Sequence, residues 1–217
     1  MGTDIHVVFQ KKDGENWVDI PHKYNEDRHY QLFAVLAGVR NGTGFAGCRI
    51  GDPVRPIAKP RGYPKDFVVE EECHPVTSLA VMSAWRQESH QKHPEWYKDE
   101  PLRIGMGYHD QSWLTGKEML AWYKKAPVVT HFGYVERSVY DQWDGKSEPT
   151  EYCGGVDGPN IVKVNDVKAE MKRKPNWTHV ACHWSQSLKK ELSYFFKEVE
   201  RLQKEHGEIR MVFGFDS

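Results

Sequence analysis

The stretch that decides the fold is residues 27–42, DRHYQLFAVLAGVRNG, an apolar run with polar residues at both ends. Its apolar side chains recur at three- and four-residue spacing, which places them on one broad stripe of a helix. Asp27 is a favourable N-terminal cap, and Asn41-Gly42 tolerates the left-handed conformation that ends a helix. The sequence therefore predicts a central buried helix from the Asp27 cap to Asn41-Gly42.

The first twenty residues predict a β-hairpin. Residues 3–10 alternate so that Ile5, Val7 and Phe9 share one face of a strand, with Asp4 and His6 on the other face. An Asp-Gly pair at positions 13 and 14 is a strong turn signal, and residues 17–20 are typical of the return strand.

The C-terminal section predicts a strand at residues 177–184, a long helix and a final strand at residues 209–215. Ser187 is expected to cap the helix and Gly207 to end it. Strand, helix and strand in this order are compatible with a βαβ unit. We expect one α+β domain over residues 1–217, with a mixed or antiparallel sheet that includes both terminal strands.

The middle of the chain is less regular. A helical pattern covers residues 75–91, and Thr115 with Glu118 forms a capping box before a helix that ends at about Lys125. Residues 128–140 are compatible with a strand or with a bent helix. Residues 41–66 and 141–160 are rich in Gly and Pro, and they are expected to be long loops that connect the packed helices.

Composition excludes several classes of protein. The chain has 217 residues, of which 28% are charged, and its net charge of −1 gives no strong sign of nucleic-acid binding. No apolar run approaches the roughly 20 residues that a membrane-spanning helix needs, and no signal peptide is recognisable. Four scattered cysteines favour reduced thiols. We therefore expect a cytoplasmic protein that makes no membrane contact.

Several stretches resemble a family of short bacteriophage and prophage proteins. They are Met-Gly-Thr-Asp-Ile-His at positions 1–6, residues 27–42, Pro-Arg-Gly at 60–62, Ser-Trp-Leu at 112–114, Gly-Gly-Val-Asp-Gly-Pro at 154–159, and Val-Phe-Gly-Phe-Asp at 212–216. The family pattern often has a His directly before Ser-Trp-Leu, where this chain has Gln111 and places His109 two residues earlier. The resemblance transfers no activity. It implies a phage accessory protein in the cytoplasm of a host bacterium, where phage proteins commonly counter host defences.

The first candidate site is a divalent metal site. Asp4 and His6 are two residues apart on a strand, so their side chains leave the same face and can converge on one ion. Metallophosphoesterases open with this Asp-x-His spacing, but the other stretches of their sites are missing here. If the terminal strands are antiparallel neighbours, Asp216 lies beside Asp4 and supplies a third ligand. The alternative is a hydrogen-bonded polar pair at the end of a strand.

Further candidates come from loops. His109 and Asp110 lie just before a helix N-terminus, and they can supply a general acid–base pair or simply cap the loop. Arg28, Arg61 and Trp113 are candidate ligand-binding residues, since guanidinium groups bind anions and aromatic rings stack on planar ligands. We expect Asp4, His6, Arg28, His109 and Asp216 to line one cleft.

Two functions follow from these candidates. The first is a metal-dependent hydrolase that acts on a nucleotide-like, phosphate-bearing small molecule, with a metal-bound water as nucleophile and His109 as acid or base. The second is a non-catalytic protein that sequesters a nucleotide signal or inhibits a host defence protein. ATP-driven and serine-hydrolase functions are not supported, since the chain has no phosphate-binding loop, dinucleotide fingerprint or Gly-x-Ser-x-Gly elbow.

Overall fold

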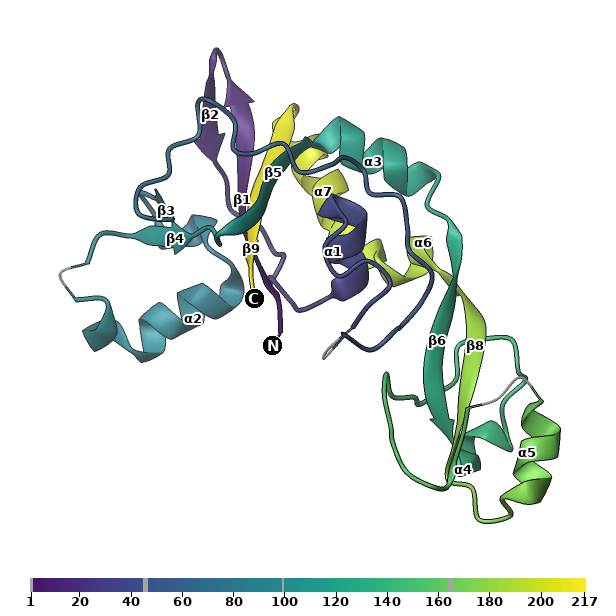
Figure 1. The fold of residues 1–217 in the computed structure, drawn as a ribbon. Coiled ribbons are helices and arrows are strands. Elements are labelled where there is room, and N and C mark those ends of the chain that lie inside the picture. Colours follow the sequence, from purple (N-terminus) through teal and green to yellow (C-terminus); the bar gives the residue numbers. More distant parts are fainter. Residues whose placement is uncertain (1, 45–46, 99, 164–165) are drawn as a thin grey trace.

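An antiparallel sheet joins the two ends of the chain in the computed structural model, which describes residues 2–44, 47–98, 100–163 and 166–217 (Figure 1). Its strands, in spatial order, are β2 (Asn16–Asp19), β1 (Asp4–Asp13), β9 (Ile209–Asp216) and β5 (His109–Thr115). In the β1–β9 register Asp4 lies opposite Asp216, and Lys11 lies opposite Ile209. This confirms the α+β fold with both terminal strands in one sheet.

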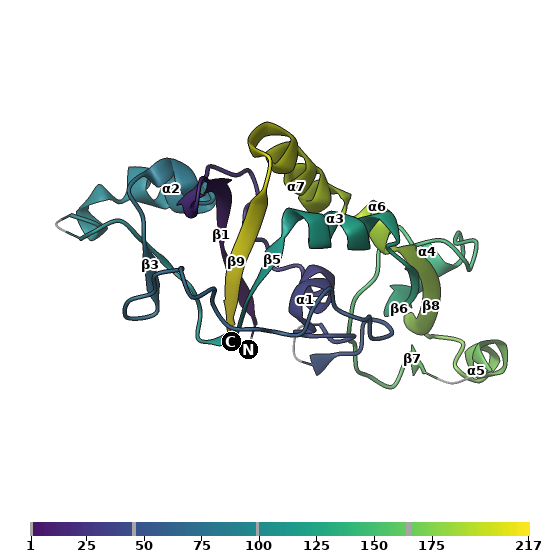
Figure 2. The ribbon, with the colours of Figure 1, turned by 90° about the horizontal axis from the view of Figure 1, so that it is seen from above.

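Four helices cover one face of this sheet (Figure 2). They are α1 (Tyr30–Ala37), α3 (Gly116–Lys124), α6 (Leu188–Glu191) and α7 (Ser193–His206). Ile5, Val7 and Phe9 point toward them and are at most 1% exposed, as alternation along the strand predicts. Each such side chain contributes roughly 1.5–3 kcal/mol by leaving water, so this face carries the main core.

The ends of α1 differ from the prediction. His29, rather than Asp27, is the N-terminal cap, and its Nδ1 accepts a hydrogen bond from the Leu32 amide. The helix ends at Gly38, which has a φ of 81° and donates its N–H to the Ala34 carbonyl. Gly38 adopts this left-handed conformation at no steric cost, so the chain leaves the helix before it reaches Asn41-Gly42.

The C-terminal helix and its flanking strands also differ. The predicted single helix is divided at Leu192 into α6 and α7, and Ser187 makes no side-chain cap hydrogen bond. The βαβ prediction is wrong because β8 (His179–Ser187) and β9 belong to different sheets. By contrast, the capping box of Thr115 and Glu118 at the start of α3 is confirmed, with both reciprocal hydrogen bonds present.

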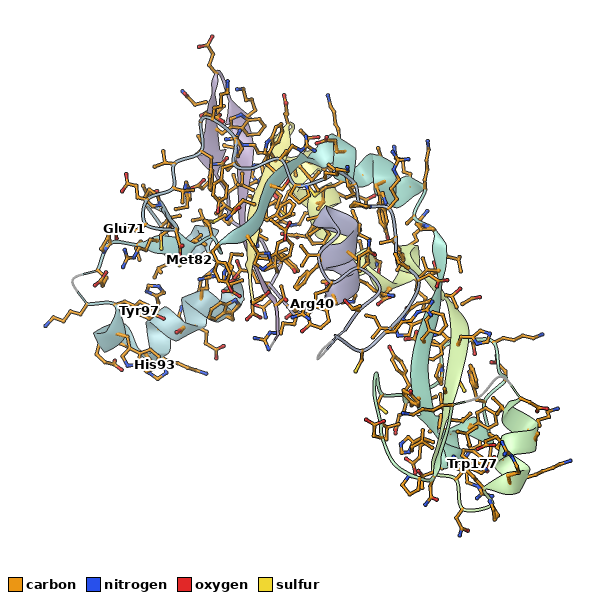
Figure 3. All side chains as sticks on the ribbon, in the orientation of Figure 1. Arg40, Glu71, Met82, His93, Tyr97 and Trp177 are labelled. Carbon is orange, nitrogen blue, oxygen red and sulfur yellow. The ribbon has the colours of Figure 1, made fainter. Side chains whose placement is uncertain are left out.

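A lobe packs on the opposite face of the sheet. It contains β3 (Cys73–Pro75), η2 (Leu79–Val81), α2 (Ala84–Lys92), η3 (Pro94–Trp96) and β4 (Arg103–Gly105). Met82 lies near the sheet and Tyr97 at the outer end of the lobe (Figure 3). The predicted helix over residues 75–91 is wrong in its first half, since Pro75 pairs with Arg103 in a short strand ladder. Val8 and Val212 face this side and join its core.

The third part is an arm that extends away from α1 (Figure 1). It is built on β6 (Val128–Glu136), β8 and the short β7 (Ile161–Val162), with α4 (Arg137–Tyr140) and α5 (Val167–Arg173). Residues 128–140, which the sequence leaves undecided, form a strand followed by a one-turn helix. Trp177 packs at the far end of the arm with Val162 and Val180 (Figure 3).

Candidate functional site

The predicted metal ligands do meet on one face of the central sheet. His6 Nε2 lies 2.8 Å from Asp216 Oδ2, and Asp216 is the register partner of Asp4. Arg28 joins them, since its Nη2 donates to Asp4 Oδ2 at 2.6 Å and its Nε donates to the other carboxylate oxygen. These hydrogen bonds from Arg28 lower the pKa of Asp4. The β1–β9 register confirms the prediction that Asp216 lies beside Asp4.

These groups are already satisfied by neighbouring side chains. Arg86 Nη2 lies 2.6 Å from His6 Nδ1, and because a guanidinium only donates, Nδ1 accepts and Nε2 donates to Asp216. Arg86 Nε donates to Glu26, whose carboxylate is 1% exposed and also accepts from the Val7 amide, Ser83 and Trp85. We call this set the strand-edge network: Asp4, His6, Glu26, Arg28, Arg86 and Asp216.

The strand-edge network in this arrangement does not fit a metal ion. Both His6 nitrogens are engaged, and Asp4 is held by Arg28. Within the described ranges no group of three or more His, Cys, Asp or Glu side chains is placed to hold a metal. A divalent cation would have to displace two guanidinium groups. The metal site and its ligands Asp4, His6 and Asp216 thus stay a prediction.

His109 and Asp110 lie on the other face of the sheet. His109 is the register partner of Phe215, which shares its face with Ile5 rather than with Asp4. A bulge places Asp110 at a φ of 50°, and its carboxylate lies 2.8 Å from His109 Nδ1. His109 Nε2 in turn lies 3.0 Å from Ser217 Oγ. The predicted cleft of five residues is therefore not formed, and the catalytic role of this pair stays a prediction.

Arg61 and Trp113 meet each other at the start of α3. The Arg61 guanidinium lies 4.6 Å from the centre of the Trp113 ring and pairs with Glu118 at 2.9 Å. Neither residue lines the cavity that Arg28 borders. The structure therefore separates the predicted ligand-binding residues into two places.

The cavity at Arg28 lies between α1 and the arm and has a volume of about 910 Å³. We call it the α1–arm pocket. The N-terminal end of α1, residues 48–50, β6, residues 152–157 and Glu191 contribute its walls. Gly155 brings two of these walls together, because a Cβ atom on it would lie 2.7 Å from Cys48 Sγ. The pocket thus depends on segments that are far apart in the sequence.

Exposed cations stand at the rim of the α1–arm pocket. They are Arg28, Arg49 and Lys163, and each pairs with a carboxylate, respectively Asp4, Asp52 and Asp157. Ion pairs exposed to water contribute about 0–1 kcal/mol, so an incoming phosphate competes with them readily. Tyrosine rings line the same cavity, namely those of Tyr30, Tyr134 and Tyr152.

The inner end of the pocket holds a perturbed carboxyl group, Glu191 on α6. Its side chain is 20% exposed, and burial, assisted by the nearby Glu148, raises its pKa to about 7. His29 Nε2 lies 3.4 Å from it. Because His29 Nδ1 accepts the Leu32 amide as the helix cap, the proton of the neutral ring is on Nε2 and faces Glu191.

His131 on β6 lines the same end. It is 4% exposed, and burial lowers its pKa, which favours the neutral ring. Its Nε2 has no hydrogen-bond partner among the described residues. A buried polar atom without a partner costs roughly 1–3 kcal/mol and calls for an explanation. Sequence reasoning missed both Glu191 and His131, since neither belongs to a motif and the residues beside them give no local signal.

The four cysteines are free thiols, as expected. No helix in the described part of the chain is long and apolar enough to cross a membrane.

The comparisons with known proteins identify no relative of this chain. No family model, no curated protein and no solved structure matches this chain.

Proposed function

We propose that this protein binds a nucleotide-like, phosphate-bearing small molecule in the α1–arm pocket. One observation carries the proposal: a cavity of about 910 Å³ combines exposed cations at its rim with tyrosine rings in its walls. Small-molecule sites are concave, have volumes of about 300–1,000 Å³, and place a few polar groups among aromatic side chains.

The chemistry of the rim supports an anionic ligand. Arg28 and Arg49 present guanidinium forks, which bind phosphate oxygens in pairs, and Lys163 adds a third positive charge. Tyr30, Tyr134 and Tyr152 offer faces and edges to a planar ring. A phosphate at the rim with a ring further inside matches this distribution.

The resemblance to phage proteins suggests the biological setting for this proposal. A protein that holds a nucleotide signal without cleaving it would act by sequestration in the host cytoplasm, as a counter-defence protein. Inhibition of a host defence protein is the alternative, and an assay with the small molecule alone separates the two.

The metal-dependent hydrolase is a second proposal. The observation that favours it is that Asp4, His6 and Asp216 share one sheet face, with His6 and Asp216 in contact. The occupancy of these groups by Arg28 and Arg86 weighs against it. Binding in the α1–arm pocket needs only exposed ion pairs to exchange, whereas a metal would also have to displace Arg86, whose side chain is 15% exposed, so pocket binding stands first.

The test is a panel of nucleotides mixed with the purified protein, read by calorimetry and by mass spectrometry for both depletion and cleavage. Arg49→Ala and Lys163→Ala should each weaken the binding of a phosphate-bearing ligand about tenfold, the loss of one charge-assisted hydrogen bond. Arg55→Ala is the matched control, since Arg55 is an exposed arginine of the same loop that does not line the pocket. Equal binding by all three variants would overturn the proposal, and cleavage would favour the hydrolase.

A further inference from the structure

A chain of two amides joins two carboxyl groups at the inner end of the α1–arm pocket. Its members, in order, are Glu191, Gln31, Gln186 and Glu148. The Gln31 NH2 group donates to Gln186 Oε1 at 3.0 Å, and the Gln186 NH2 group donates to Glu148 Oε1 at 3.3 Å. The Gln31 oxygen consequently faces both oxygens of Glu191, and it meets only acceptors there.

Turning the amides moves this mismatch along the chain without removing it. A turned Gln31 gives Glu191 a donor, but it sets the Gln31 oxygen 3.0 Å from Gln186 Oε1. Turning Gln186 in answer sets its oxygen against Glu148 Oε1. Because each amide donates on one side and accepts on the other, two amides in series cannot serve two ionised carboxylates. One added proton, at either end, satisfies the whole chain.

The proton belongs on Glu191 rather than on Glu148. The Glu191 side chain is 20% exposed, whereas Glu148 is exposed to water. Water stabilises the ionised form of a carboxyl group, and burial favours the neutral form, which is also why the pKa of Glu191 is raised to about 7. A neutral Glu191 donates its O–H to the Gln31 oxygen and leaves the rest of the chain as it stands.

The other groups that face Glu191 keep their charge around pH 7. His29 Nε2 lies 3.4 Å away, and burial lowers the pKa of His29. His131 lines the same end of the pocket, and burial lowers its pKa too. Tyr152 and Tyr194 interact electrostatically with Glu191, and burial raises the pKa of both hydroxyl groups. The rim cations are paired with carboxylates of their own.

Building on the proposed function, we infer that the α1–arm pocket takes up a phosphate-bearing anion together with one proton from solvent, which Glu191 carries as a neutral carboxylic acid. An ionised Glu191 would repel an anion in the same cavity, and the neutral form removes this repulsion. The neutral form also keeps Glu148 bonded through the two amides. Because Glu148 lies just before the pocket wall of residues 152–157, the same proton ties that wall to α6.

The experiment uses adenosine 3′,5′-cyclic monophosphate, whose single phosphodiester charge stays constant between pH 6 and 8. Its affinity should be up to about tenfold higher at pH 6 than at pH 8, because the protonated fraction of Glu191 changes about tenfold across its pKa. At pH 7, calorimetry in two buffers of different ionisation enthalpy should show the uptake of about half a proton.

Two variants separate Glu191 from other groups that titrate. Glu191→Gln should bind the probe at pH 8 about as tightly as the unchanged protein binds it at pH 6, because its NH2 group donates to Gln31 in place of the proton. The same variant should take up no proton. Glu200→Gln, at an exposed glutamate of α7, is the matched control and should keep both the pH dependence and the uptake.

A measurement without ligand completes the test. In a carbon-13 titration of the glutamate carboxyl groups, the signal that is missing from Glu191→Gln should titrate near pH 7, and titration near 4.5 would overturn the inference. Equal affinity at pH 6 and 8, or a dependence that survives in Glu191→Gln, would overturn the inference alone, provided that Arg49→Ala still weakens binding. If neither this probe nor the nucleotide panel binds, the proposed function fails and the inference fails with it.

Discussion

The strand-edge network and the α1–arm pocket contain similar residues in opposite states. In the network, Arg86 donates hydrogen bonds to both His6 and Glu26. The carboxylate of Glu26 is almost completely buried. In the pocket, His131 keeps an unpartnered nitrogen, and the pKa of Glu191 is raised to about 7. Saturated polar groups hold a fold together, whereas unsatisfied and perturbed groups mark a place for a ligand. We therefore expect the first region to contribute stability, and we propose binding for the second.

The largest expected effect tests the structural side of this comparison. Glu26→Ala removes the acceptor that holds Arg86, Ser83, Trp85 and the Val7 amide, and leaves the largely buried Arg86 guanidinium without its carboxylate partner. The free energy of unfolding should fall by about 3–5 kcal/mol, as when one partner of a buried ion pair is removed. Urea denaturation measures it, with Glu151→Ala at an exposed glutamate as control. A loss under about 1 kcal/mol would mean that the network does not stabilise the fold.

The second prediction concerns the pH dependence of stability at Glu191. Its folded-state pKa of about 7 lies above the ordinary value of 4.5, so between these values the folded state holds a proton that the unfolded state has lost. The free energy of unfolding therefore falls as the pH rises from 4.5 to 7, by up to about 3 kcal/mol. Glu191→Gln should lack this contribution in urea denaturation.

The comparison with Glu191→Gln is needed because other groups titrate nearby. Burial lowers the pKa values of His29 and His131, so their contribution is lost as the pH falls and opposes that of Glu191. Glu148, Tyr152 and Tyr194 also interact electrostatically with Glu191. A wild-type minus variant difference that stays constant from pH 4.5 to 7 would contradict the assignment of Glu191 as a perturbed carboxyl group.

A third, smaller effect separates the two roles of His29. His29→Ala removes the cap of α1 and should cost about 1 kcal/mol of unfolding free energy, whereas His29→Asn restores a capping oxygen and should recover most of it. Neither loss should exceed the effect of Glu26→Ala. If the Asn variant is as unstable as the Ala variant, the contact with Glu191, rather than the cap, is what His29 contributes.

The smallest expected effect concerns metal. Because Arg28 and Arg86 already occupy Asp4 and His6, addition of Mn²⁺ or Zn²⁺ to chelator-treated protein should shift the melting temperature by less than about 1 °C. A shift of several degrees that Asp216→Asn abolishes would restore the metal proposal and make the strand edge a functional site as well.

The elements with a strong local signal could be predicted from the sequence. Alternation along residues 3–10 and 209–215 gave the terminal strands, and the capping box gave the start of α3, because these patterns act within a few residues. The ends of α1 could not be placed in this way. Several residues near each end are acceptable caps, and the packing of the helix decides between them.

The site could be predicted only in part. Arg28 was identified as a ligand-binding residue and does border the pocket, yet its partners there come from residues 48–50, 131–134, 152–157 and 191. The spacing of Asp4 and His6 correctly placed both on one strand face, and the expected pairing of the terminal strands correctly placed Asp216 beside Asp4. This spacing could not show that Arg86, 80 positions further along, would donate a hydrogen bond to His6 Nδ1.

The sequence by itself determined which faces of the terminal strands are apolar, where α3 begins and which residues carry charge, since these depend on side chains a few positions apart. Only the tertiary structure decided that Asp4 and His6 are hydrogen-bonded by Arg28 and Arg86, while Glu191 is largely buried and His131 is buried at a cavity. Burial and ion pairing depend on which distant segments come together, and they set both the pKa of a carboxyl group and the hydrogen-bond partners of an imidazole.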